Sequence, residues 1–386
     1  MTTPTLAKSC CGLLLDRLTY VLLLVAAVRF FQIAIYHGHD FEVYWKAMHA
    51  WISGVSPYHY TPEMVGFVFK YPPWLLPLFL PFSLASLYTA RVFWATIQFF
   101  SIAYAFFWLI REGVAKRTAI LVLLLYWWIW IGHAYSGQIT VFCLMVGLWS
   151  ARNVKSSVRF STALVIFSSK IFSLFTFLGR WKEILQLRFI LGVLGFIVLA
   201  NAIVFWVDQK WGANAGIFDI YINWIKAASS GNAELGSEVV RGQMNHGFVA
   251  GILRWIPVSF TNIYYDIGVS LVLMTFFGTL WMRASRRLSG AESFAGWLAF
   301  GVVVLPLAWS HSFVLTFPLS ALALDRAIRT KKKKLIFTAL MGIIFIGILV
   351  SQIFGNTLVR PIELVNIKSW GVCLTAWALY QSQNLG

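Results

Sequence analysis

Apolar residues fall in long, unbroken runs along this chain, and short polar or basic stretches separate the runs. The first run covers residues 13–36, and a helix of roughly 20 apolar residues is long enough to cross the hydrocarbon core of a bilayer. These runs do not show the alternation of a transmembrane β-barrel. The pattern therefore predicts an all-helical, polytopic integral membrane protein.

Later apolar runs predict the remaining membrane segments. A stretch broken by prolines begins at Pro73 and leads into a helix that ends near Arg111. The other expected spans cover residues 119–131, 139–150, 184–207, 263–282, 294–307, 313–324, 335–354 and 370–380. We expect about 10–12 membrane segments in a single transmembrane domain, residues 1–386, with no separate soluble domain.

The run at 160–178 breaks the pattern because basic residues flank both of its ends. Arg159 precedes the run, and Arg180 and Lys182 follow it. Basic residues mark cytoplasmic ends, and one passage cannot have both ends in the cytoplasm. We therefore expect two half-helices or a re-entrant hairpin with Lys170 near the apex, an arrangement that membranes tolerate where the backbone lines a cavity.

Composition and charge agree with a membrane protein. Hydrophobic residues make up 59% of the chain and charged residues 12%, a balance that needs lipid to cover the surface. The net charge of +17 comes from clusters between apolar runs, which is typical of cytoplasmic anchors and not of a nucleic-acid surface. Lys8 and Arg17 place the N-terminus in the cytoplasm, and the lysines at 331–334 mark that side again. The expected location is an inner or plasma membrane.

The cysteines do not indicate disulfide or metal chemistry. Cys10 and Cys11 are adjacent near the N-terminus, while Cys143 and Cys373 lie inside apolar runs. This spacing is neither a disulfide framework nor a CxxC metal motif. No cleavage pattern precedes the first apolar run, so we interpret that run as a retained signal-anchor.

The unusual polar residues gather in two long loops, 36–72 and 208–261, which the charge pattern places on the external side. The first loop opens with His37-Gly-His-Asp-Phe-Glu-Val-Tyr-Trp45. Asp40 and Glu42 lie two residues apart, so on a helix they point to different faces and cannot act as a pair. One carboxylate is therefore the better candidate for chemistry.

Several landmarks in and between these loops occur in a recognisable order. They are Asp40-Phe-x-Val-Tyr44, Gly54 with Pro57-Tyr58, Tyr71-Pro-Pro73, Ala90-Arg91-x-x-Trp94, Gly137-Gln138, Lys170 with Leu178-Gly-Arg-Trp-Lys182, Asn245-His-Gly-x-x-x-Gly251-x-x-Arg254 and Pro306-x-x-Trp309-Ser-His311. Over roughly residues 30–330 this series resembles the polyprenyl-phosphate-mannose-dependent mannosyltransferases, glycosyltransferase family 87 of the GT-C glycosyltransferases. Ser173 stands where that family's Lys-x-x-Pro segment has its proline.

The resemblance implies a GT-C fold and an inverting sugar transfer. A sugar, expected to be mannose, would move from a polyprenyl-phosphate donor to a hydroxyl of a lipid- or glycan-linked acceptor on the extracytoplasmic face, without cofactor or metal. The general base would be Asp40, because a carboxylate among aromatics at the membrane surface is partly desolvated. Glu42 and Glu63 are reserves for this role.

Transfer also needs cations for the departing lipid phosphate and an apolar groove for the prenyl chain. The cationic candidates are Lys170, His311, Arg254 and Arg91, with Arg29 a weaker one. A cation near the bilayer interior costs about 2.5–3.5 kcal/mol, which makes Lys170 the most unusual of them. Snorkelling, interfacial anchoring or a structural histidine would explain the same residues without a ligand.

The candidates for sugar or acceptor contacts are aromatic and amide side chains, namely Tyr44, Tyr58, Tyr71, Gln138, Asn245 and Trp309. An interfacial aromatic belt and ordinary turn chemistry explain them nearly as well. A polytopic transporter or lipid flippase is the alternative function, and a non-catalytic assembly subunit is a third. A transporter would be expected to show internal repeats and charges along a path through both leaflets, which this sequence does not show.

Overall fold

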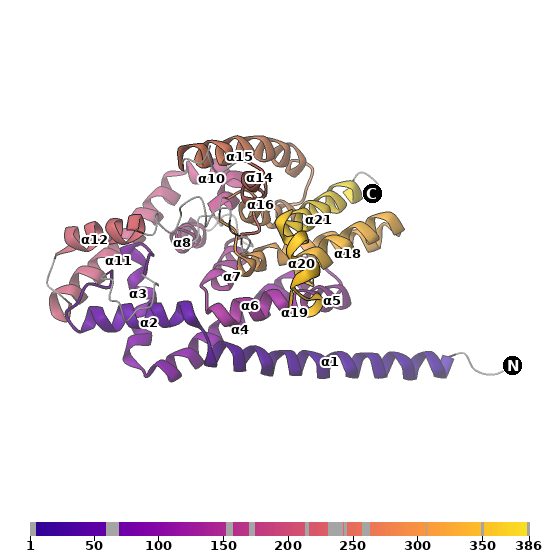
Figure 1. Ribbon diagram of the computed structural model, residues 1–386, viewed down its shortest axis with the longest axis horizontal. Coiled ribbons are helices and arrows are strands. Elements are labelled where there is room, and N and C mark those ends of the chain that lie inside the picture. The colour runs from indigo at the N-terminus through magenta and orange to yellow at the C-terminus, as the bar shows by residue number, and fades with distance from the viewer. Residues whose placement is uncertain are drawn as a thin grey trace.

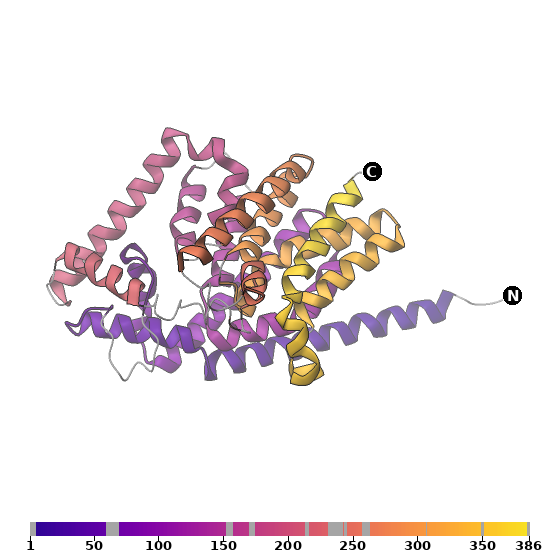
Figure 2. The ribbon, with the colours of Figure 1, turned by 45° about the horizontal axis from the view of Figure 1, so that its top comes forward.

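The computed structural model describes residues 5–58, 69–151, 157–169, 174–212, 216–230, 242, 245–256, 263–305, 307–348 and 351–383. These residues form helices and connecting turns, with one isolated β-bridge between Asn245 and Trp309. Helix α1 (Thr5–Tyr36) runs along one side of the body and extends beyond it at its N-terminal end, as Figures 1 and 2 both show. The all-helical class predicted from the apolar runs is confirmed for these residues.

By length and composition, several described helices are able to cross a membrane. They are Arg17–Tyr36 of α1, α4 (Leu87–Arg111), α11 (Leu187–Lys210) and Gly268–Ser285 of α15 (Ile263–Ser285). Only 6% to 39% of the most apolar window of each is buried inside the protein. Exposing the remaining apolar surface to water would cost much free energy. These helices therefore indicate that the chain is a membrane protein. The finer count of about 10–12 segments and the side that each loop faces stay predictions.

The first long loop is largely helical. Helix α2 (His39–Ile52) follows α1 after a two-residue break, and η2 (Pro73–Leu75), α3 (Leu76–Phe79) and η3 (Leu80–Leu84) lead back towards α4. Prolines divide this return path because proline removes a backbone donor and cannot continue a regular helix. Trp45 Nε1 donates to the Ala85 carbonyl at 3.0 Å and so ties α2 to the start of α4.

The predicted span at 119–131 is a bent pair of helices. Helices α5 (Lys116–Leu125) and α6 (Trp127–Ser136) meet at Tyr126 with a bend of 57°, and α7 (Thr140–Ala151) follows after a tight turn. The Tyr126 hydroxyl hydrogen-bonds to Thr316 (2.8 Å) and Ser320 (2.6 Å) at this bend. These hydrogen bonds therefore fix the bend between α5 and α6 against η6 and α17.

The break expected within 160–182 is present. Helix α8 (Ser157–Phe167) stops well short of the end of the apolar run, and η4 (Phe175–Arg180) and α10 (Trp181–Ile184) come after it. Lys170, the expected apex, lies outside the described residues. The interruption is thus confirmed, while the sidedness of its two ends stays a prediction.

The second long loop contains α12 (Ile217–Ser230) and α14 (Phe248–Arg254). The C-terminal part consists of α16 (Gly290–Val304), η6 (Ser310–Thr316), α17 (Phe317–Arg329), α18 (Lys333–Gly347), α19 (Ser351–Phe354), α20 (Asn356–Leu364) and α21 (Ile367–Gln383). Helices α18 and α21 pack closely because Gly342 and Gly371 face each other, where an added Cβ would lie within 2.6 Å of the opposite carbonyl oxygen. A capping box of Ser289 and Glu292 starts α16.

Candidate functional site

Asp40 lies in the first turn of α2, directly after the sharp corner at the end of α1. Gly38 makes this corner with a left-handed φ of 53°, and an added Cβ would lie 3.0 Å from the Ala34 carbonyl oxygen. Glycine adopts this conformation without strain, whereas most other residues do not. The corner turns the chain so that Asp40 faces the turn between α6 and α7.

The α6–α7 turn packs against that corner through a second glycine. Gly137 has a φ of 69°, and a Cβ added to it would lie 2.9 Å from Gly38 Cα and 3.0 Å from Phe41 Cβ. This contact brings the next residue, Gln138, to Asp40, where the amide Nε2 donates a hydrogen bond to Oδ2 of the carboxylate. Two residues 98 positions apart are thereby joined.

Helix α4 fixes the backbone of the same turn. Trp94 Nε1 donates to the Gly137 carbonyl at 2.8 Å, and Gln98 Nε2 donates to the Gln138 carbonyl at 3.1 Å. Gln98 is fully buried and was not among the residues expected from sequence. Its signal was a glutamine inside an apolar run, which is costly unless the amide is hydrogen-bonded.

Tyrosines from the first loop form the other wall of the Asp40 region. The Tyr44 and Tyr71 hydroxyls hydrogen-bond at 2.8 Å, and the Tyr58 hydroxyl donates to the Tyr71 carbonyl at 2.9 Å. Burial, then Tyr71, then the Asp40 carboxylate raise the pKa of Tyr44 well above its usual value. Both Tyr44 and Tyr58 are buried, so they support the site from behind and do not present a ring face to a sugar. Tyr71 is only partly buried.

Arg91, at the start of α4, pairs with the second carboxylate of α2. Its Nη2 lies 2.6 Å from Glu42 Oε2, and Lys46 Nζ lies 2.9 Å from the other oxygen of Glu42. The Arg91 Nε atom is buried close to Gly38 and has no hydrogen-bond partner among the described residues. Glu42 thus balances two cations two residues from Asp40, and the two carboxylates have different partners.

The chain just before Lys170 reaches this same region. Ser168 Oγ accepts from Trp74 Nε1 at 2.9 Å, and Ser169 Oγ hydrogen-bonds with Cys143 Sγ at 3.4 Å. The Cys143 thiol is close enough to Tyr44 to contribute to the rise of its pKa, after burial and the nearer groups. The end of α8 therefore packs on the Asp40 region, although Lys170 itself and Glu63 lie outside the described residues.

The expected residues of the second loop form a separate cluster. Asn245 pairs with Trp309 in the isolated β-bridge, and its side-chain Oδ1 accepts from the backbone N–H groups of Gly247 (3.2 Å) and Ala308 (2.9 Å). Asn245 is buried, with both of these contacts inside the protein. Its amide therefore ties two loops together, and the sugar contact expected from sequence stays a prediction.

Arg254 has a similar structural role. Its guanidinium donates to the carbonyls of Gly242, Asn245, Glu363 and Leu364 and to Asn366 Oδ1 at 2.6 Å. These acceptors occupy the Nη1 and Nη2 donors of Arg254 that would otherwise bind a phosphate. The geometry thus gives Arg254 the role of holding loops, and the phosphate contact expected from sequence stays a prediction.

His311 lies in η6, on an element that packs against both α6 and α7. These are the helices on either side of Gln138, so η6 lies next to the helices that carry the Gln138 turn. The side chains of Trp309 and His311 are partly exposed. Among the expected residues, Asp40, Gln138, Tyr44 and Tyr71 are thus in one region, and His311 is on a neighbouring element.

Two buried bases beside Arg254 were not expected from sequence. Lys368 is 1% exposed and donates to the Ile346 carbonyl at 3.2 Å, and His246 is 3% exposed. Burial lowers the pKa of Lys368 to about 8. Burial, and then the charges of Lys368 and Arg254, lower the pKa of His246 well below its usual value. The local sequence pattern does not show that either side chain is buried.

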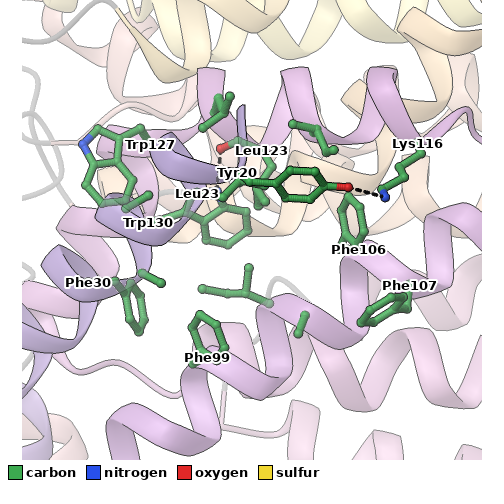
Figure 3. Close-up of a pocket in the computed structure, with 16 residues that line it drawn as sticks. Tyr20, Leu23, Phe30, Phe99, Phe106, Phe107, Lys116, Leu123, Trp127 and Trp130 are labelled. Atoms are coloured by element: carbon green, nitrogen blue, oxygen red, sulfur yellow. Dashed lines mark hydrogen bonds between the residues drawn. The ribbon is translucent and has the colours of Figure 1, made fainter. Parts of the chain in front are cut away.

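An apolar cavity of about 360 Å³ lies between α1, α4, α5 and α6 (Figure 3). Phe30 and Phe99 line one part of it, and Lys116 Nζ donates to the Tyr20 hydroxyl at 3.1 Å at another. Most of the wall is aliphatic or aromatic. The cavity lies along α1, which leads to Asp40, and along α4, which carries Arg91 near its start.

No group of three or more His, Cys, Asp or Glu side chains in the described part of the chain is placed to hold a metal ion. The fold and the site together define an all-helical membrane protein with a carboxylate–amide contact at a loop junction. Comparisons with known protein families, curated proteins and solved structures find no match for this chain.

Proposed function

We propose that this protein is a GT-C-type membrane glycosyltransferase that moves a sugar from a polyprenyl-phosphate donor to an acceptor hydroxyl. The donor sugar would be mannose, by the order of motifs that resembles glycosyltransferase family 87, and the acceptor would be lipid- or glycan-linked. The observation that carries the proposal is the hydrogen bond from Gln138 Nε2 to Asp40 Oδ2. A neutral amide orients a carboxylate without cancelling its charge, so the carboxylate keeps its capacity to accept a proton.

In the proposed reaction the acceptor oxygen attacks the anomeric carbon from the side opposite the phosphate. The hydroxyl proton moves to the Asp40 carboxylate, the bond from the anomeric carbon to the phosphate oxygen breaks, and polyprenyl phosphate leaves with the electron pair. Configuration at the anomeric carbon is inverted. Arg91, Lys170 and His311 are the proposed cations for the phosphate, because charge develops there as the bond breaks. Arg91 would bind the phosphate through donors other than Nη2, which pairs with Glu42.

The apolar cavity of Figure 3 supports a place for the prenyl chain. It lies along α1 and α4, and Phe99 is eight positions beyond Arg91, which corresponds to about 12 Å of helix. A phosphate near Arg91 would therefore leave its lipid chain pointing towards this cavity. The aromatic walls offer the apolar surface that an isoprenoid chain needs.

The experiment uses purified full-length protein in liposomes that contain polyprenyl-phosphate mannose and a membrane glycolipid fraction as the acceptor, and it detects free polyprenyl phosphate. We expect Asp40→Asn to lower turnover by about 10²–10⁴-fold, because a general base contributes about that much. Asp219→Asn, at an exposed acid on α12, is the matched control and should retain activity. Normal turnover by folded Asp40→Asn protein would discard the assignment of Asp40. Absence of turnover by the unmodified protein with every polyprenyl-phosphate sugar offered would discard the transferase proposal.

A lipid flippase remains the alternative, and the bent pair α5–α6 is the observation that favours it. Interrupted helices are typical of transporters, where they allow two access states. The two functions are distinguished by covalent chemistry. A flippase would change the leaflet of a fluorescent polyprenyl-phosphate sugar while the sugar stays attached, whereas a transferase would release the sugar from the lipid.

A further inference from the structure

A second apolar groove lies between α15, α16 and α21, away from the residues of the proposed transfer site. Its volume is about 500 Å³, within the usual size of small-molecule sites. Apolar side chains form its body, among them Phe277, Phe300, Val303 and Val372. The groove is continuous with the exposed apolar surface of α15, since Leu280 of that helix lines it and is 48% exposed. A lipid chain can therefore enter it from the side.

Short side chains shape this groove. Gly296 on α16 has no side chain at the point where Trp281 of α15 lies, because an added Cβ would be 1.8 Å from Trp281 Cζ2. Ala284 and Ala376 also line the groove with short side chains. Trp281 Nε1 is buried and has no hydrogen-bond acceptor among the described residues, although indole N–H groups usually have one.

One end of the groove is basic. Arg283 and Arg287, in and after the last turn of α15, line this end, and Arg287 Nη1 lies 3.4 Å from the Tyr380 hydroxyl. None of the described residues that line the groove is acidic. An occupant that matches both parts has an anionic group joined to an apolar chain.

The basic end coincides with the end of a candidate membrane span. Gly268–Ser285 of α15 is apolar enough to cross a bilayer, so Arg283 and Arg287 fall where the hydrocarbon gives way to headgroups. Arginine binds phosphate with several donors in a fixed geometry. The two arginines thus lie at the membrane depth expected for the phosphate of a lipid whose acyl chain lies in the groove.

We propose that this groove binds one anionic glycerophospholipid, with its phosphate at Arg283, Arg287 and Tyr380 and an acyl chain along the apolar body. The site does not depend on the proposed transfer reaction. The bound lipid fills the space between α15 and the helices α16 and α21, and so joins α15 to the rest of the bundle. Trp281 Nε1 gains an acceptor in this arrangement.

The test is native mass spectrometry of the full-length protein, titrated in detergent with phosphatidylglycerol and, separately, with phosphatidylcholine. We expect one retained phosphatidylglycerol and a preference of about tenfold or more over phosphatidylcholine, as two arginines near an anionic headgroup predict. The double variant Arg283→Gln/Arg287→Gln should bind phosphatidylglycerol no better than phosphatidylcholine. Arg283→Lys/Arg287→Lys should restore most of the preference.

Arg286→Gln is the matched control, because Arg286 is exposed in the same basic cluster but does not line the groove. An equal loss of binding in this control would show a general effect of surface charge and would overturn the proposal. Equal retention of the two lipids by the unmodified protein would also overturn it, as would displacement of the lipid by millimolar inorganic phosphate. Ala376→Trp, which fills the groove, should weaken both lipids, and unchanged binding would place the lipid elsewhere.

Discussion

The two long loops bring polar residues together in different ways. In the first loop, Asp40 receives a hydrogen bond from Gln138 and lies beside partly exposed Tyr71, while Glu42 takes the nearby cations. In the second loop, Arg254 and Asn245 are occupied by backbone groups of neighbouring loops. Both regions are rich in polar side chains, but Asp40 accepts from a side-chain amide beside a partly exposed tyrosine, whereas Arg254 and Asn245 hold neighbouring loops. Polar residues in these two loops thus differ in their hydrogen-bond partners. Those partners determine whether a side chain is available to a ligand or holds loops together.

Removal of Arg254 should have the largest effect on stability. Arg254→Met leaves several partly buried carbonyls without a donor, and each such group costs about 1–3 kcal/mol, so we expect a loss of about 3 kcal/mol or more. Thermal unfolding in detergent, followed by tryptophan fluorescence, measures it. Arg188→Met is the matched control, because Arg188 is exposed and its hydrogen bond among the described residues is a local one, to Gln186. Equal stability of the two variants would contradict the anchoring role of Arg254.

The close approach of two turns at the first loop gives the next prediction. Gly137→Ala should destabilise the protein by about 2–3 kcal/mol for two reasons. Alanine is strained at the left-handed φ of this position, and its Cβ would lie 2.9 Å from Gly38 Cα. Gly113→Ala separates these two causes, since Gly113 has a φ of 85° but no atom within 4 Å of an added Cβ. We expect the control to lose only about 1 kcal/mol. Identical losses, compared by the same unfolding measurement, would show that the contact between the turns contributes nothing.

The amide that orients Asp40 gives a smaller effect, on activity instead of stability. Gln138→Leu should lower turnover in the liposome assay by about 10–100-fold, because a general base that is no longer oriented towards the acceptor proton accelerates the reaction much less. Gln32→Leu, at an exposed glutamine of α1, is the control and should leave turnover unchanged. Normal turnover by Gln138→Leu would remove the observation on which the proposed function rests.

Acid pH should reveal the buried histidine of the second loop, His246. His246 has a pKa well below its usual value when folded, so below about pH 6.5 the unfolded chain binds a proton that the folded chain does not. Stability should therefore fall with falling pH, by about 1 kcal/mol from pH 6.5 to pH 5.5. His246→Gln should flatten this part of the pH profile, whereas His37→Gln, at an exposed histidine, should not. A profile that is the same with and without His246 would contradict its burial as a neutral base.

Several features of the fold were predictable because their causes are local. Long apolar runs predict helices whatever their neighbours are, and α4, α11 and α15 end within a few residues of the predicted limits. The flanking charges of the 160–178 run predicted an interruption, and α8 does end at Phe167. The helical content of the loops was missed, because α2 and α12 are short and their apolar faces are stabilised by contacts with distant segments.

The sequence by itself determined the all-helical membrane class and drew attention to Asp40, Gln138 and Arg91, since hydrophobic runs and out-of-place polar residues are visible in one dimension. Only the tertiary structure decided which polar residues meet. Gly38 and Gly137 bring Asp40 to Gln138, whereas Arg254 and Asn245 meet carbonyls that occupy them. The physical reason is that a side chain's role depends on its hydrogen-bond partners and burial, which residues far apart in the chain supply.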